Sequence, residues 1–293
     1  MPFRPIIRLY SEKSGDRRPA ANGMMARMPE LSRRTILGLG IGAVGAYALG
    51  TTAPASAAPT FASGFFMSAA RGGVLTQWAI ARPPGQTTPL RPIIALHGKG
   101  QSAAGVMAGG VEQALAGAVA AGVPPVAVVA VDGGGTYWHK RTSGEDAGAM
   151  VLDELLPMLG TQEIDTSRVA FLGWSMGGYG ALLLGSQLGA ARTAAICAVS
   201  PALWTSAGAA APYAFDGAAD YEAHNVWGRP ELNSIPVRID CGDSDPFAEA
   251  TRQFIAQLPN SPAGGFSPGG HDGGYWSSQL PAELAWTAPL LVA

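Results

Sequence analysis

The protein has 293 residues and a formal net charge of −2, from 19 lysines and arginines against 21 aspartates and glutamates. Hydrophobic residues make up 47% of the chain and charged residues 14%, which excludes a disordered protein, because such chains combine low hydrophobicity with high charge. No surplus of positive charge is present to neutralise phosphates, so we do not expect nucleic-acid binding as the main task.

Residues 31–57 have the features of an export signal. The pair Arg33-Arg34 precedes an apolar, glycine-rich run from Ile36 to Leu49, and Ala55-Ser56-Ala57 offers a cleavage site. The run has about 14 residues, whereas a helix needs roughly 20 to span a bilayer. We therefore predict that residues 1–57 are a twin-arginine export signal with an N-terminal extension. An uncleaved membrane anchor is the alternative.

Removal of residues 1–57 changes the charge balance, because they hold eight of the basic and three of the acidic side chains. Residues 58–293 then carry 11 basic and 18 acidic side chains, a net charge of −7 over 236 residues. An acidic surface suits an exported protein and disfavours nucleic acid or anionic membranes as partners. We expect a secreted or envelope-associated protein with no stable membrane insertion after cleavage.

Residues 58–293 read as one domain in which short apolar strands alternate with helices. In chain order we predict strands Phe65–Ala70, Val74–Ala81 and Arg91–Leu96, helix Ser102–Ala121, strand Pro125–Val131, helix Glu145–Leu159, strand Arg168–Leu172, helix Met176–Leu188, strands Thr193–Val199 and Val237–Cys241, helix Pro246–Leu258, and a last helix from about Gln279. This order predicts an α/β fold, with a mostly parallel central sheet covered by helices on both faces. Active sites in such sheets lie outside the carboxyl ends of the strands.

The two cysteines, Cys197 and Cys241, both lie in apolar, strand-like runs. They are too few for a disulfide scaffold or a cysteine-rich zinc site. We expect two buried free thiols, with a disulfide between them as the alternative.

The segment Gly173-Trp174-Ser175-Met176-Gly177 has the pattern G-x-S-x-G between a predicted strand and a predicted helix. This is the context of a nucleophile elbow, in which flanking glycines allow a sharp turn that exposes the serine hydroxyl. We therefore predict Ser175 as a nucleophile.

A serine hydroxyl is a weak nucleophile and needs a base. Of the four histidines, only His224 and His271 follow Ser175, as the chain order of serine, acid and histidine in this kind of sheet requires. His271 lies in a glycine-rich loop that could reach the nucleophile, whereas His224 lies in a polar, helix-like stretch. We predict His271 as the base and expect His97, an earlier histidine, to brace its own loop.

The acid that orients the imidazole should lie just past the strand Val237–Cys241. The candidates are Asp243 and Asp245 in Gly242-Asp243-Ser244-Asp245-Pro246. Asp243 could be a turn residue and Asp245 a helix cap. We prefer Asp245.

An oxyanion formed during acyl transfer needs preorganised N–H donors. One should be the backbone N–H of Met176, the residue after the nucleophile, and the second should come from the loop His97-Gly98-Lys99-Gly100 after an early strand. We assign the second donor to the N–H of Lys99.

Residues 203–235 form a long insertion rich in aromatic side chains, and it is either a cap that packs on itself or a wall of the substrate pocket. Trp138 also has two readings, because it follows the glycine turn of a strand and either lines the pocket or belongs to the core or a lid. Our pocket candidates are Trp138, Trp174, Trp204 and Trp276.

No metal or cofactor is expected. The sequence has no H-E-x-x-H or C-x-x-C pattern and no acidic metal cluster. It also has no G-x-G-x-x-G motif after a strand and no Walker A pattern, so a nucleotide cofactor is unsupported.

These segments resemble the esterase branch of the α/β-hydrolase superfamily, which includes esterase D, feruloyl esterases and mycobacterial mycolyltransferases, and among them the exported actinobacterial type. The resemblance extends from about residue 62 to residue 285. It rests on four segments, which are Leu96-His97-Gly98, Gly173–Gly180, Gly242–Phe247 and Gly270–Trp276. It implies an α/β-hydrolase fold, the triad Ser175, Asp245 and His271, and oxyanion donors at Lys99 and Met176. In related enzymes the residue at the position of Lys99 is often apolar.

The sequence therefore predicts a secreted serine carboxylesterase that acts on a small-molecule or lipid ester through an acyl-enzyme on Ser175. One alternative is an acyltransferase, similar to the mycolyltransferases, acting on a cell-envelope glycolipid. The other is a non-catalytic binding protein on a hydrolase fold.

Overall fold

The computed structural model describes residues 60–293. The predicted export signal at residues 1–57 lies outside the described residues, so the signal and the domain boundary after it stay predictions. Among the helices of residues 60–293, none combines the length and the apolar character that crossing a membrane would require.

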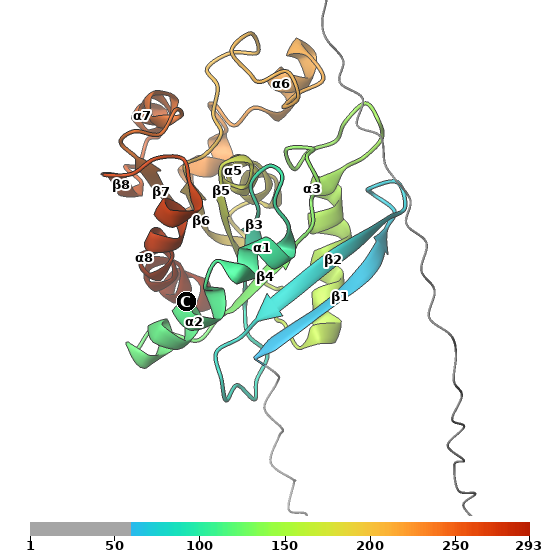
Figure 1. Cartoon of the computed structure of the whole chain (residues 1–293), viewed down its shortest axis with the longest axis vertical. Helices are drawn as coiled ribbons and strands as arrows, with labels where there is room; N and C mark the ends of the chain where they lie inside the picture. Colours follow the sequence, from blue (N-terminus) through green and yellow to red (C-terminus); the bar gives the residue numbers. More distant parts are fainter. Residues whose placement is uncertain (1–59) are drawn as a thin grey trace, which may run out of the picture. The chain divides into compact units, whose positions relative to one another are not determined.

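Within residues 60–293, eight strands form one sheet in the order β1-β2-β4-β3-β5-β6-β7-β8 (Figure 1). The strands are β1 (Phe61–Ser68), β2 (Val74–Ala81), β3 (Pro92–Leu96), β4 (Ala127–Val131), β5 (Val169–Trp174), β6 (Thr193–Val199), β7 (Val237–Gly242) and β8 (Ala263–Ser267). Strands β1, β2 and β4 pair antiparallel, and all other neighbours pair parallel. The prediction of a mostly parallel central sheet is confirmed.

Helices cover both faces of the sheet, as predicted. One face carries α1 (Ala103–Ala108), α2 (Val111–Ala120) and α8 (Gly273–Val292). The other carries α3 (Ala147–Ala149), the π-helix η1 (Met150–Leu155), α4 (Leu156–Leu159), α5 (Met176–Leu188) and α7 (Ala248–Gln257). The short elements η2 (Gly160–Gln162), α6 (Ala218–His224) and η3 (Pro230–Asn233) complete the chain, and Figure 1 shows α6 on the orange insertion.

The strands explain why both faces are covered. In β3, Ile94 and Leu96 join the core under α5, while Ile93 and Ala95 join the core under α1, α2 and α8. Successive side chains of a strand point to opposite faces, so an uninterrupted apolar strand must be buried on both.

Several predicted boundaries are wrong for local reasons. The helix predicted over Ser102–Ala121 is two helices, because Gly110 adopts a left-handed φ of 92° and separates α1 from α2. The last helix begins at Gly273 and not near Gln279, because the carboxylate of Asp272 caps it by accepting the Tyr275 N–H at 3.0 Å.

Other differences concern pairing and burial. Strand β1 begins at Phe61, four residues before the predicted start, because Phe61 pairs with Ala81 at the far end of β2. The helix predicted over Glu145–Leu159 begins at Ala147 and contains a π-helical segment. Cys197 and Cys241 are buried free thiols, which confirms that prediction.

Candidate active site

The predicted site residues lie in loops that follow four parallel strands. Lys99 follows β3, Ser175 follows β5, Asp245 follows β7 and His271 follows β8. Because parallel strands end at one edge of the sheet, these loops share that edge.

Ser175 occupies a strained turn between β5 and α5. Its φ of 55° and ψ of −120° lie outside the regions that non-glycine residues ordinarily adopt. The chain comes so close here that a Cβ on Gly173 would collide with the carbonyl of Gly177, and a Cβ on Gly177 would collide with the carbonyl of Leu96. The two glycines therefore permit the turn that presents the serine hydroxyl.

Three predicted residues meet in one line of hydrogen bonds. His271 Nε2 lies 2.9 Å from Ser175 Oγ, and His271 Nδ1 lies 2.8 Å from Asp245 Oδ2. An ionised carboxylate can only accept, so Nδ1 carries the proton toward Asp245 and Nε2 is left to accept from the serine. This is the tautomer in which an imidazole can act as a base toward Ser175.

The loops that carry the acid and the histidine are tied to each other through their backbones. The N–H of Ser244 donates to the carbonyl of Gly269 at 3.0 Å, and the N–H of Asp243 donates to the carbonyl of Ser267 at 2.9 Å. Sequence neighbours of Asp245 and His271 are thus held together, which fixes the distance between the two side chains.

Asp245 is enclosed, with no exposed side-chain surface, whereas the side chain of His271 is 23% exposed. Burial acts to raise the pKa of Asp245, but hydrogen bonds from His271 and from the Phe247 N–H hold the pKa below its usual value. The carboxylate therefore stays charged beside the imidazole.

The competing candidates lie elsewhere. The side chain of Asp243 is 52% exposed and faces Arg252 at 4.0 Å. His224 Nδ1 donates to the Asp220 carboxylate, 2.7 Å away, and the His224 ring stacks on His139. The structure therefore places Asp245 and His271, and not Asp243 or His224, beside Ser175.

His97 braces the loop after β3. Its Nε2 accepts the Gly133 N–H at 2.9 Å, and its Nδ1 lies 2.8 Å from the Gly98 carbonyl. Because Nε2 accepts a backbone N–H, the ring is neutral, and it joins the loops after β3 and β4. Burial lowers the pKa of His97, in the same direction.

The two expected oxyanion donors lie in loops that touch. The carbonyl of Leu96, at the end of β3, packs against Gly173 and Gly177 on either side of the elbow. Within residues 60–293, neither the N–H of Met176 nor that of Lys99 is used in a hydrogen bond to another residue. Both groups are free to receive an acceptor from outside the chain.

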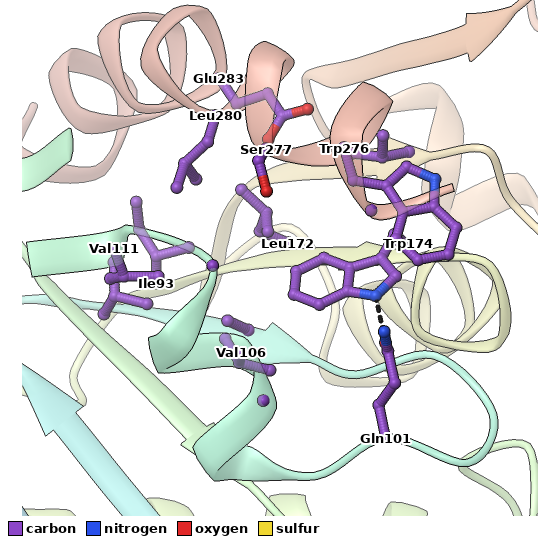
Figure 2. Close-up of a pocket in the computed structure, with 16 residues that line it drawn as sticks. Ile93, Gln101, Val106, Val111, Leu172, Trp174, Trp276, Ser277, Leu280 and Glu283 are labelled. Atoms are coloured by element: carbon purple, nitrogen blue, oxygen red, sulfur yellow. Dashed lines mark hydrogen bonds between the residues drawn. The ribbon is translucent and has the colours of Figure 1, made fainter. Parts of the chain in front are cut away.

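Trp174 and Trp276 stack with ring centroids 5.8 Å apart, and Trp276 meets His271 edge-on at 5.2 Å. Both tryptophans line an apolar cavity of about 110 Å³ between α1 and α8 (Figure 2). Figure 2 shows Ile93, Val111 and Leu280 at the far end of this cavity. Two of the four pocket candidates thus border a cavity next to the elbow.

The other two tryptophans differ. Trp204 packs against Phe247, which contacts the His271 ring at 5.3 Å, so the insertion 203–235 both packs on itself and reaches the site. Trp138 is fully buried and lies against Gly133 and Gly180, where a Cβ would collide with its indole. The expectation that Trp138 lines the pocket is therefore wrong, because these glycines admit it into the core.

Two contacts at the site were not predicted. Gln101 Oε1 accepts hydrogen bonds from the Gly98 N–H and from Trp174 Nε1. Lys99 Nζ lies over the ring of Tyr213 in the insertion. No sequence pattern marks the contact of Gln101 with Trp174 or that of Lys99 with Tyr213, because each joins side chains far apart in the chain.

Two groups of described residues have ligand atoms close enough to suggest a metal site, but neither is arranged to hold one. His139 and His224, near Asp220, are stacked with planes only 22° apart, so their lone pairs do not converge on one point. In the second group, around Cys197 and Glu283, Arg238 already occupies both oxygens of Asp240 at 2.6 and 2.9 Å.

The sequence matches the family model Esterase, described as "Putative esterase", over residues 77–287. A ferulic acid esterase structure is similar, with 20% identity, a TM-score of 0.65 and coverage of 78% of this chain and 97% of the other. An S-formylglutathione hydrolase from Agrobacterium tumefaciens has 18% identity and a TM-score of 0.64, with coverage of 79% of this chain and 95% of the other. MPT51 from Mycobacterium tuberculosis has 19% identity and a TM-score of 0.63, with coverage of 80% of this chain and 100% of the other. These likenesses show an α/β-hydrolase fold. Among curated proteins, none matches the sequence.

Proposed function

The chain belongs to the Esterase family, and on that basis we propose that it is a serine carboxylesterase that forms an acyl-enzyme on Ser175. The observation that carries the proposal is the line from Ser175 Oγ through the His271 ring to Asp245, with distances of 2.9 and 2.8 Å. In this arrangement a nucleophile, a base and a group that orients the base each have a residue.

In the first half of the reaction, Ser175 Oγ forms a bond to the ester carbonyl carbon and His271 Nε2 takes the hydroxyl proton. Asp245 stabilises the imidazolium, and the N–H groups of Lys99 and Met176 hold the oxyanion. The bond from carbon to the alcohol oxygen then breaks, and His271 gives its proton to the leaving alcohol. Water repeats the sequence on the acyl-enzyme and releases the acid.

The acyltransferase alternative is not favoured. The matched family is described as an esterase, and the cavity beside Trp174 is small, with a volume of about 110 Å³. We propose small-molecule esters as substrates.

The test compares the parent protein with Ser175→Ala on p-nitrophenyl esters of increasing acyl length. The exposed Ser261→Ala is the matched control. We expect turnover by the parent and the control and none above background by Ser175→Ala. Equal rates from all three would overturn the serine mechanism and favour a binding role on a hydrolase fold.

We also propose that the protein is secreted or envelope-associated through the twin-arginine route, on the sequence pattern around Arg33-Arg34. Replacing both arginines by lysine should retain the full-length protein inside the cell, as measured by fractionation and immunoblotting. Unchanged export of the double variant would contradict the proposal.

A further inference from the structure

The loop that carries Lys99 is a tight turn closed at both ends by Gln101. The N–H of Gln101 donates to the Gly98 carbonyl at 3.1 Å, and its side-chain oxygen accepts the Gly98 N–H, also at 3.1 Å. Gly100, the third residue of the turn, has the left-handed φ of 76° that a type II turn requires at this place. Gly98, the residue before Lys99, is thus held by Gln101 through both its N–H and its carbonyl.

The same oxygen of Gln101 reaches the elbow. Trp174 Nε1 donates to Gln101 Oε1 at 2.5 Å, a bond drawn in Figure 2. One acceptor therefore joins Gly98, which precedes Lys99, to Trp174, which precedes Ser175 and Met176. These are the two segments whose N–H groups the proposed oxyanion site needs.

The Trp174 indole is held by stacking as well as by this bond. It stacks on Trp276 and borders the cavity of about 110 Å³ that Val106 and Leu280 line from α1 and α8. A ring stack tolerates sliding, whereas a hydrogen bond is directional. The hydrogen bond to Gln101 therefore adds a restraint that the stack does not supply.

We propose that Gln101 is a positioning residue that holds the Lys99 and Met176 N–H groups at the spacing an oxyanion needs. The inference rests on the proposed function, because it assigns a role within that reaction. Gln101 itself does not touch the reacting atoms. It acts by fixing the loop after β3 against the elbow after β5, and a misplacement of about 1 Å can cost 10²-fold in rate.

Gln101→Met keeps the length of the side chain and removes the acceptor. We expect kcat to fall by about 10- to 100-fold with KM changed less than about threefold, because the oxyanion is absent from the bound ester and forms only on the way to the tetrahedral intermediate. Gln253→Met makes the same chemical change at an exposed position of α7 and should match the parent. The melting temperature of each variant is measured beside its kinetics.

A trifluoromethyl ketone forms an oxyanion adduct on a serine, so its inhibition constant reports on the oxyanion site. A purely structural role of Gln101 would leave this constant unchanged. The inhibition constant should rise for Gln101→Met by the factor by which kcat/KM falls. Trp174→Phe removes the indole donor of the same hydrogen bond. The loss of kcat that it causes should be smaller in the Gln101→Met protein than in the parent, because the first substitution has already broken that bond.

The proposal is overturned if Gln101→Met retains the parent kcat, if its loss is confined to KM, or if the losses of the two variants multiply. Failure of the proposed function looks different, because Ser175→Ala would then keep its turnover. If Ser175→Ala is inactive while Gln101→Met equals the parent, the esterase mechanism stands and the role of Gln101 does not.

Discussion

Lys99 Nζ lies 2.8 Å from the centre of the Tyr213 ring, so the loop after β3 contacts the insertion 203–235 through a cation–π pair. Lys99 is exposed, and about half of the Tyr213 surface is exposed as well. Such a pair at an exposed site is worth about 0.5–1 kcal/mol. The side chain of Lys99 therefore secures the insertion, while the proposed catalytic contribution of the residue comes from its backbone.

Lys99→Met separates these two contributions. We expect kcat to stay within about threefold of the parent, because the N–H is unchanged, and limited proteolysis near Tyr213 to become faster. Lys140→Met, another exposed lysine, is the control and should alter neither quantity. A loss of kcat by 10²-fold in Lys99→Met would show that the ammonium group itself acts in the reaction.

The two candidate acids can be distinguished by one pair of variants. Asp245→Asn should lower kcat by roughly 10⁴-fold, because an amide no longer holds the imidazole tautomer or stabilises the imidazolium. Asp243→Asn should leave kcat within about twofold, because its side chain faces Arg252 and solvent. Initial rates on one ester measure both, and the opposite ranking would move the acid to Asp243.

The pH dependence of kcat/KM should have a single rising limb. His271 must be unprotonated to accept the serine proton, so kcat/KM rises with pH as the base becomes available. Asp245, whose pKa lies below its usual value, stays ionised above about pH 5 and adds no second limb there. A flat profile of kcat/KM would count against His271 as the base.

The close approach of the chain at the elbow can be tested by comparing Gly177 with a glycine whose Cβ position is open. Gly177→Ala should lower the free energy of unfolding by about 2 kcal/mol or more and reduce kcat, because the added Cβ collides with the Leu96 carbonyl. Gly117→Ala, at an exposed position of α2 with nothing near its Cβ position, should stabilise the fold by up to about 1 kcal/mol. Urea unfolding measures both, and equal effects would contradict the described close approach.

Glu283 on α8 should make stability fall as pH rises. Burial, followed by the nearby charge of Asp240, raises its pKa well above the usual value, so the folded protein holds a proton that the unfolded chain releases. Stability from this group is complete below the ordinary glutamate pKa and is lost as pH climbs toward the raised value.

Glu283→Gln keeps the shape and removes the titration. Between pH 5 and pH 8 the free energy of unfolding of Glu283→Gln should rise relative to that of the parent. The difference between the two should increase by at most about 1.4 kcal/mol per pH unit. Urea unfolding at several pH values gives the difference. A constant offset between the two proteins would mean that Glu283 titrates like an exposed glutamate.

Much of the site could be predicted because its residues sit in local patterns. Ser175 lies between a strand and a helix in G-x-S-x-G, and the chain order then leaves few choices for the acid and the base. The structure brings Asp245 and His271 to Ser175, and their catalytic roles stay predictions for the variants above.

What could not be predicted depends on contacts across the sheet. Gln101 and Trp174 are 73 positions apart, and their hydrogen bond depends on two rotamers that no periodicity encodes. Trp138 shows the same limit, because its place in the core depends on Gly133 and Gly180 leaving room from two other segments. The break at Gly110 was visible as a glycine, but only its left-handed φ ends the helix.

The backbone of Ser175 has an evolutionary consequence. A non-glycine residue at φ 55° and ψ −120° costs about 1–3 kcal/mol, which the surrounding fold must offset. Glycine would relieve that strain, so any lineage that no longer needed the hydroxyl would gain stability from the change. The proposed nucleophilic role of the hydroxyl would explain why a serine is kept in a conformation that lowers the stability of the folded chain.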